Sequence, residues 1–295
     1  MEEEYKIRVV GNIEILQRII KLNSHYDGLY VEISKDKIDF QKMDEHHHTA
    51  VFGSVKKELF SIFETEHLDK EILAHIVLSN LVDFVKCLNA KTTTFEMLLC
   101  AEQKEIVQFR FPEDGTKFVR IITVDNNILS IGEERLEMVH RLPTYVFKMS
   151  ANAMCQFVWD SCYPGKEYTG DEAQFDQLHI PEKRMILTLM ARKIIFIGTI
   201  SKTESVEYSF EPEKDKNIFS RTSTESLSLD FRMDLFFRIL RTCCRTEDIV
   251  FSVAGDFPME MKIDLGKDSY IQYVMAPMVD DEVYEQVRSK RQKVQ

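Results

Sequence analysis

The order of predicted secondary structure repeats along the chain, and this repetition constrains the fold more than any other feature. A strand, a helix, further strands, a second helix and closing strands follow one another, and the same order returns at an offset of roughly 140–155 residues. The alternation at 5–9 predicts a strand and the spacing at 13–22 a helix. Their counterparts are a strand at 145–147 and a helix that begins after Ser150. We therefore predict an α+β fold of two similar domains, each with two helices packed on antiparallel sheet.

The domain boundaries follow from the same repetition. Residues 1–127 are predicted to form the first domain and residues 143–282 the second. Between them, residues 128–142 are acidic and irregular, which is typical of a connecting loop. Residues 283–295 form a basic tail.

Composition excludes several classes of protein. Lys and Arg number 38 and Asp and Glu number 49, so the formal net charge is −11, and 44% of the residues are hydrophobic, which is typical of a globular chain. No apolar run approaches the roughly 18 residues that a bilayer-spanning helix needs. The acidic opening lacks the basic and apolar regions of a secretion signal. The six cysteines form no zinc pattern, and we expect reduced thiols.

No pattern in the sequence predicts catalysis, a cofactor or a metal site. Glycine-rich phosphate loops, a nucleophile elbow and metalloprotease motifs are absent. His46, His47 and His48 are adjacent, so their side chains diverge, which favours a solvated loop over a metal site. The acidic run at 280–282 is interpreted as a solvated segment, and the two cysteines at 243–244 as helix packing residues. We expect that the protein is not an enzyme.

Cations gather on the polar faces of predicted helices, although the chain is acidic. Arg238, Arg241 and Arg245 follow at i, i+3 and i+7, opposite an apolar face. The other cations on or next to predicted helices are Arg18, Lys21, Lys86 and Lys91. Segregated positive charge on an acidic protein indicates a polyanionic ligand such as nucleic acid. The spacing fits equally well with helices that carry ordinary solvated lysines and arginines.

Blocks of sequence along nearly the whole chain carry a family resemblance. The clearest are the loop QKMDEHH at 41–47, the strand IVFSVAGDFP at 249–258 and the closing block YIQYVMAPMVDDE at 270–282. The helix segment LFF at 235–237 and the strand VFKM at 146–149 add to them. In this order, the blocks resemble those of the PCNA family, the eukaryotic-type DNA sliding clamps, of which the chain would be a divergent member.

The resemblance implies a processivity factor rather than a catalyst. Three subunits would form a homotrimeric ring around double-stranded DNA, with helices lining the hole and contacts to phosphates that are independent of base sequence. The ring would tether DNA polymerase and other replication and repair proteins through a hydrophobic groove, and a clamp loader would place it on DNA. Strands at 118–124 and 204–211 would pair across subunits. The implied location is the nucleus, or a viral replication compartment, and the basic run at 288–293 is a candidate nuclear signal.

The resemblance also implies roles for individual residues. Those facing DNA would be Arg18, Lys21, Lys86, Lys91, Lys148, Arg238, Arg241 and Arg245. Those in the partner groove would be Met43, His47, Leu136, Met138, Pro258, Val274, Ala276 and Pro277. The third helix departs from the family because it offers Asn152, Gln156 and Asp160 but no cation. That part of the hole would be less positive than usual.

Three departures in length keep other functions open. The segments 56–72, 163–178 and 201–226 are longer than the family leads one to expect, and the last lies beside a predicted subunit contact. The alternatives are a subunit of a heterotrimeric checkpoint clamp and a monomeric viral-type processivity factor that binds DNA by charge. A hydrolase that uses His47 and Asp44 is a further, less favoured hypothesis.

Overall fold

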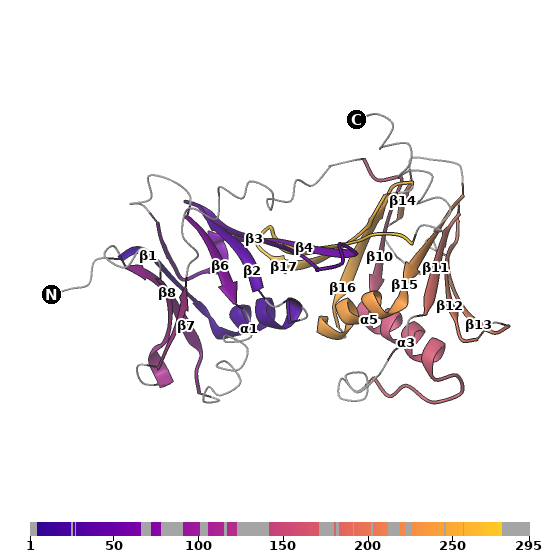
Figure 1. Cartoon of the computed structure of the whole chain (residues 1–295), viewed down its shortest axis with the longest axis horizontal. Coiled ribbons are helices and arrows are strands. Elements are labelled where there is room, and N and C mark those ends of the chain that lie inside the picture. Colours follow the sequence, from indigo (N-terminus) through magenta and orange to yellow (C-terminus); the bar gives the residue numbers. More distant parts are fainter. Residues whose placement is uncertain are drawn as a thin grey trace. The chain divides into compact units, whose positions relative to one another are not determined.

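The computed structural model places the chain in two compact units (Figure 1). Unit 1 comprises Met1–His140 with Lys262–Tyr273, and unit 2 comprises Arg141–Met261 with Val274–Gln295. The structure describes residues 5–24, 26, 28–65, 72–77, 91–100, 106–114, 117–122, 142–170, 180, 183–190, 192–201, 203–211, 219–221, 226–244, 246–255 and 257–278. The second helix predicted for the first repeat, which the periodicity places near 78–91, lies outside these residues apart from Lys91. The connecting loop 128–142 lies outside them apart from Leu142.

The first repeat consists of nine strands and one helix among the described residues. They are β1 (Tyr5–Asn12), α1 (Ile13–Leu22), β2 (Gly28–Ile33), β3 (Lys37–Met43), β4 (Thr49–Lys56), β5 (Ile62–Glu64), β6 (Ile72–Val77), β7 (Thr94–Cys100), β8 (Ile106–Phe111) and β9 (Lys117–Ile122). Short 3₁₀ turns at Lys57–Leu59 and Pro112–Asp114 complete it.

The second repeat has nine strands and two helices in the described part of the chain. They are β10 (Tyr145–Ser150), α3 (Ala151–Cys162), β11 (Arg184–Leu189), β12 (Ile194–Thr199), β13 (Ser205–Phe210), β14 (Phe219–Arg221), β15 (Leu227–Arg232), α5 (Met233–Thr242), β16 (Asp248–Val253), β17 (Met259–Gly266) and β18 (Ser269–Met275). The described residues contain the repeated strands and the first helix of each repeat, and the second helix of the second repeat. None of the helices in the described ranges has the length and apolar character that crossing a bilayer requires.

The two repeats also share their strand order. In the first, the strands run β5-β1-β7-β8-β9 and β4-β3-β2-β6, and in the second they run β14-β10-β16-β17-β18 and β13-β12-β11-β15. Each position in one repeat has a counterpart in the other, so β4 corresponds to β13 and β9 to β18. The segment Lys262–Tyr273 of β17 and β18 belongs to unit 1, where β18 lies next to β4 and the Lys56 N–H donates to Ser269 Oγ at 2.8 Å.

Short strands extend one sheet of each repeat beside its first strand. β5 pairs with β1 through Arg8 and Glu64, and β14 pairs with β10 through Tyr145 and Arg221. The polar composition of the stretch 212–226 is typical of a loop, but the stretch contains β14. Two of the three long segments thus contribute an edge strand.

Side-chain caps and apolar stripes explain the helices. The Asn12 side chain accepts from the Glu14 N–H at the start of α1, and Ser150 Oγ accepts from the Ala153 N–H at the start of α3. α1 buries Leu16 and Ile20 on its inner face. α5 begins without a side-chain cap hydrogen bond, and its first-turn acid, Asp234, forms an ion pair with Arg232 at 2.8 Å.

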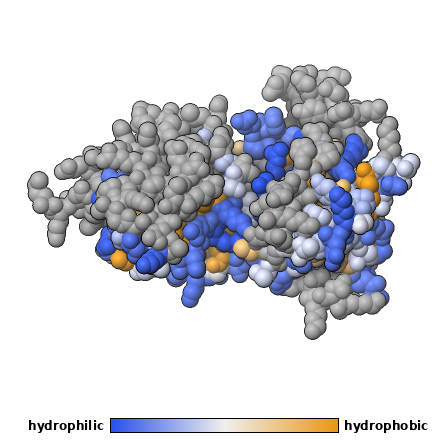
Figure 2. Space-filling view, turned by 90° about the horizontal axis from the view of Figure 1, so that it is seen from below, coloured by the Kyte–Doolittle hydropathy of each residue, from blue (hydrophilic) through white to orange (hydrophobic). Residues whose placement is uncertain are grey.

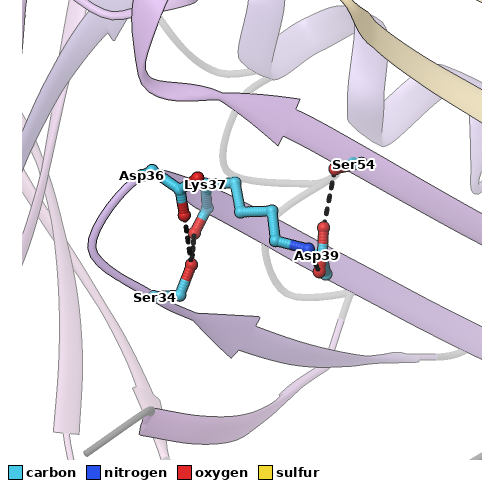
Figure 3. A network of polar contacts seen from close by, with 5 residues as sticks. All are labelled: Ser34, Asp36, Lys37, Asp39 and Ser54. Carbon is cyan, nitrogen blue, oxygen red and sulfur yellow. Dashed lines mark hydrogen bonds and ion pairs between the residues drawn. The ribbon is translucent and has the colours of Figure 1, made fainter.

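A polar network fixes the hairpin between β2 and β3 (Figure 3). Ser34 Oγ donates to Asp36 Oδ1 at 3.1 Å and the Ser34 N–H donates to the Lys37 carbonyl at 3.0 Å. Asp39 receives Lys37 Nζ at 2.5 Å and Ser54 Oγ at 2.7 Å. The hydrogen bond to Asp39 raises the pKa of Lys37. The network holds β2, β3 and β4 in one register.

Unit 2 has a core rich in aromatic rings. The Phe147 and Phe251 rings stack at 4.9 Å, and Phe196 lies 5.6 Å from Phe157 of α3. α3 approaches β12 closely at Gly198, where a Cβ would overlap Ser161 Oγ and lie 2.7 Å from Ser161 Cβ. The absence of a side chain at Gly198 therefore lets the helix pack directly on the strand.

Replacing Gly198 by Ala is expected to destabilise the protein by about 1–3 kcal/mol, because the new methyl group forces α3 away from β12. Chemical denaturation monitored by the fluorescence of Trp159, which lies in α3, measures the change. Thr199→Ala, at the next position of the same strand, is the control and is expected to change stability by less than about 0.5 kcal/mol. Equal stability of Gly198→Ala and the wild type would contradict this account of the packing.

Candidate functional site

α5 presents a cationic face to solvent. Its inner face buries Phe236, Ile239 and Leu240, whereas Arg238 and Arg241 are exposed and lie three residues apart on the same side. The spacing predicted from the sequence is therefore realised for these two arginines. Arg245, the third member of the series, lies outside the described residues.

α3 packs beside α5 in unit 2 and has a polar face of a different kind (Figure 1). Asn152 is exposed, while Gln156 and Asp160 are half-buried. The Gln156 side-chain amide donates to both Asp160 carboxylate oxygens at 3.0 Å, and the Tyr208 hydroxyl donates to the same carboxylate. α3 carries no Lys or Arg, as the sequence predicts, and hydrogen-bond donors surround its one acid.

The remaining cations of the predicted DNA-facing set differ in their surroundings. Lys148 Nζ lies 2.5 Å from Asp248 Oδ2, so a neighbouring acid offsets its charge. Arg18 and Lys21 are half-buried on α1, and Lys91 is exposed before β7. Lys86 lies outside the described residues.

Viewed from below Figure 1, the described surface is mainly hydrophilic, with apolar residues in small separate groups (Figure 2).

The predicted groove residues of unit 1 lie on an ordered turn after β3. The His47 N–H donates to the Asp44 carbonyl at 3.0 Å, and the Thr49 N–H donates to Asp44 Oδ1 at 2.6 Å. His47 adopts a φ of 58°, its side chain is exposed, and its Nδ1 lies 2.7 Å from Met43 Sδ. The turn thus brings Met43 and His47 together at its surface.

The predicted groove residues of unit 2 lie at the start of β17 and at the end of β18. Pro258, Val274, Ala276 and Pro277 are all half-buried. The Met278 N–H donates to the Asp230 carbonyl at 2.7 Å, which ties the segment after β18 to β15. Two further groove residues, Leu136 and Met138, lie outside the described residues.

The surroundings of the candidate metal-binding and catalytic residues are visible in part. The described residues contain no group of three His, Cys, Asp or Glu side chains that could hold a metal ion. Asp44, one of the two residues of the hydrolase hypothesis, accepts a backbone hydrogen bond within its own turn. The cysteines at 155, 162, 243 and 244 are free thiols. The acidic run at 280–282 lies outside the described residues.

One contact with a candidate functional role is not predicted by the sequence. Tyr208 and Asp160 are 48 positions apart, and they meet only because α3 lies over β13. The sequence does show a tyrosine in a predicted strand and an acid on the polar side of a predicted helix. Nothing in their spacing indicates that they form a pair.

The chain is similar to solved sliding-clamp structures over nearly its whole length. PCNA from Thermococcus kodakaraensis has a TM-score of 0.73 at 13% identity, covering 92% of this chain and 100% of that one. PCNA from Entamoeba histolytica has a TM-score of 0.71 at 14% identity, covering 94% and 100%. PCNA from A. fulgidus, solved with the C-terminal region of FEN-1 bound, has a TM-score of 0.71 at 12% identity, covering 93% and 99%. The predicted α+β sliding-clamp fold is confirmed.

No family model matches the chain, and no curated protein matches it. What the chain shares with the clamps is therefore the arrangement of its backbone rather than the identity of its residues.

Replacing Asp44 by Ala is expected to destabilise the protein by about 1–2 kcal/mol, because the Thr49 N–H loses its side-chain acceptor. Glu45→Ala, at the exposed neighbouring position, is the control and is expected to have little effect. Denaturant midpoints of the two variants decide the matter. Unchanged stability of Asp44→Ala would show that this hydrogen bond does not hold the turn together.

Proposed function

We propose that this chain is a DNA sliding clamp, a processivity factor that encircles duplex DNA and tethers replication and repair proteins to it. The observation that carries the proposal is that corresponding strands of the two repeats differ in whether a second strand pairs with their edge. In the sheet of unit 1, β4 has β18 as a neighbour on one side and β3 on the other. Its counterpart β13 pairs only with β12 in the described part of the chain. β9, the counterpart of β18, likewise pairs only with β8 among the described strands.

The duplication supplies both halves of a contact between copies. Because β9 corresponds to β18 and β13 to β4, β9 of one copy and β13 of another can pair as β18 and β4 do. The contact joins two different surfaces, so it repeats head to tail and forms a ring if the rotation closes. Three copies make the homotrimer that the sequence resemblance implies.

The side chains of β13 support this contact. Val206, Tyr208 and Phe210 lie on the same side of the strand and remain half-exposed, whereas Phe196 on the neighbouring β12 is fully buried. A strand edge that displays partly exposed large apolar side chains is a site for association with another chain.

DNA binding is proposed for the cationic helix face. Exposed Arg238 and Arg241 are its best-supported members, and Lys86, Lys91, Lys148, Arg18, Lys21 and Arg245 complete the proposed set. Cations on helices can contact phosphates without reading bases, which is what sliding requires. The net charge of −11 would disfavour DNA elsewhere on the surface.

Partner binding is proposed for the residues around the His47 turn, the start of β17 and the end of β18. The PCNA of A. fulgidus has been solved with the C-terminal region of FEN-1 bound. In this chain, the residues named above would take short peptide motifs of DNA polymerase and other partners. A clamp loader and a nuclear or viral replication compartment belong to the same proposal. The protein would perform no chemistry and need no cofactor.

The solution mass tests the ring. Light scattering during size-exclusion chromatography, over a dilution series, is expected to show a species near three times 34.6 kDa from this chain alone. A chain that stays monomeric at every concentration would contradict the homotrimer. If the monomer then assembles with two other clamp-like chains, the protein is a subunit of a heterotrimeric clamp. If the monomer binds DNA on its own, it is a viral-type processivity factor.

Neutralising the α5 face tests DNA binding. The double variant Arg238→Ala/Arg241→Ala is expected to weaken retention on end-blocked linear duplex DNA and to reduce the salt slope of binding by about 2, one for each lost phosphate contact. Arg192→Ala, an exposed cation on the hairpin between β11 and β12, is the control and is expected to leave both unchanged. If Arg192→Ala weakens retention as much as the double variant does, DNA does not bind specifically at the α5 face. If retention is the same on DNA with open and with blocked ends, the protein does not encircle DNA.

A further inference from the structure

Tyr208 joins the edge strand β13 to helix α3 through two kinds of contact. Its hydroxyl donates a hydrogen bond to Asp160, whose carboxylate also receives the Gln156 amide. Its ring lies 5.6 Å from Phe157 of α3 and 6.3 Å from Phe210 of its own strand. The strand is therefore fixed to the helix at its centre by one polar contact and one aromatic contact.

The corresponding strand of the first repeat is held in another way. β4 has β3 on one side and β18 on the other, and the Lys56 N–H reaches Ser269 Oγ at 2.8 Å. Within the described residues, β13 has a neighbouring strand on one side only. A strand with one free edge has fewer backbone hydrogen bonds to fix its position, so side-chain contacts carry more of that task.

We infer that Tyr208, through its hydrogen bond to Asp160, holds β13 in the position from which it pairs with a second copy of this chain. Tyr208 is thus a positioning residue for self-assembly, and the inference rests on the proposed function. An edge that is already ordered loses less conformational freedom when another strand joins it, so the contact strengthens association.

The protonation of the hydroxyl supports this role. Burial and the hydrogen bond to Asp160 raise the pKa of Tyr208, so the group remains a donor at neutral and mildly alkaline pH. Hydrogen bonds to a charged acceptor are among the stronger ones in proteins. The aromatic contact with Phe157 survives replacement of Tyr by Phe, which separates the hydroxyl from the ring.

The test is the self-association of the full chain carrying Tyr208→Phe. The dissociation constant, measured by light scattering over a dilution series, is expected to rise about tenfold per subunit contact. Tyr163→Phe removes the same atom from a tyrosine after α3 that does not belong to β13, and it is expected to leave the constant unchanged. In an Asp160→Ala background, Tyr208→Phe is expected to add no further weakening, since the acceptor is already gone.

Hydrogen exchange on dilute, unassembled protein tests the ordering directly. The amides of β13 are expected to exchange faster in Tyr208→Phe, while those between β11 and β15 remain unchanged. If Tyr208→Phe does not fold, Asp160→Asn retains the shape of the contact, removes the charge and is expected to weaken association to a smaller degree.

The outcomes separate this inference from the proposed function. A wild-type ring whose Tyr208→Phe variant assembles equally well overturns the inference and leaves the clamp intact. A wild-type chain that never self-associates overturns both. Unchanged β13 exchange in Tyr208→Phe overturns the inference whatever the oligomeric state.

Discussion

The backbone hydrogen bonds at the free edge of a β-strand must be satisfied or protected, and this requirement organises the whole chain. Each repeat covers one side of its first strand with a three-residue strand, β5 beside β1 and β14 beside β10. β4 in unit 1 is followed by β18, while β9 and β13 end their sheets in the described part of the chain. Exposed edges of this length invite pairing. In the proposed assembly, β9 and β13 are the two complementary edges, and a head-to-tail contact between them forms a closed ring if the rotation closes.

The two helices of unit 2 divide the tasks that this arrangement creates. α3 packs closely on β12 at Gly198 and binds β13 through Tyr208 and Asp160, so its polar residues serve the structure. α5 presents Arg238 and Arg241 to solvent. A cation at position 160 is incompatible with this contact, because a lysine in place of Asp160 would remove the acceptor of the Tyr208 hydroxyl.

Local patterns in the sequence predicted the parts of the structure that depend on local periodicity. The arginines of α5 lie opposite Phe236 and Leu240 because helical spacing alone separates the two faces. The sequence does not predict β14, because this strand lies in a polar segment and its three residues are too few to show alternation. The ion pair of Lys148 with Asp248 depends on the register between β10 and β16. The two residues are 100 positions apart, and neither segment contains a pattern that predicts this register. The groove residues after β18 were predicted only from the resemblance to the PCNA family, because no periodicity of the sequence indicates them.

Charge and topology lead to the same view of how such a protein would hold DNA. A ring retains DNA by linkage, so its contacts with phosphates need only guide the duplex, and tight binding would oppose sliding. In unit 2, the described helix faces carry two exposed arginines on α5, while Asp160 on α3 is surrounded by donors and the charge of Lys148 is offset by Asp248. Few exposed cations on an acidic chain give weak, salt-sensitive attraction. Retention would then depend on closure of the ring, and hence on the edge strand that Tyr208 holds in place.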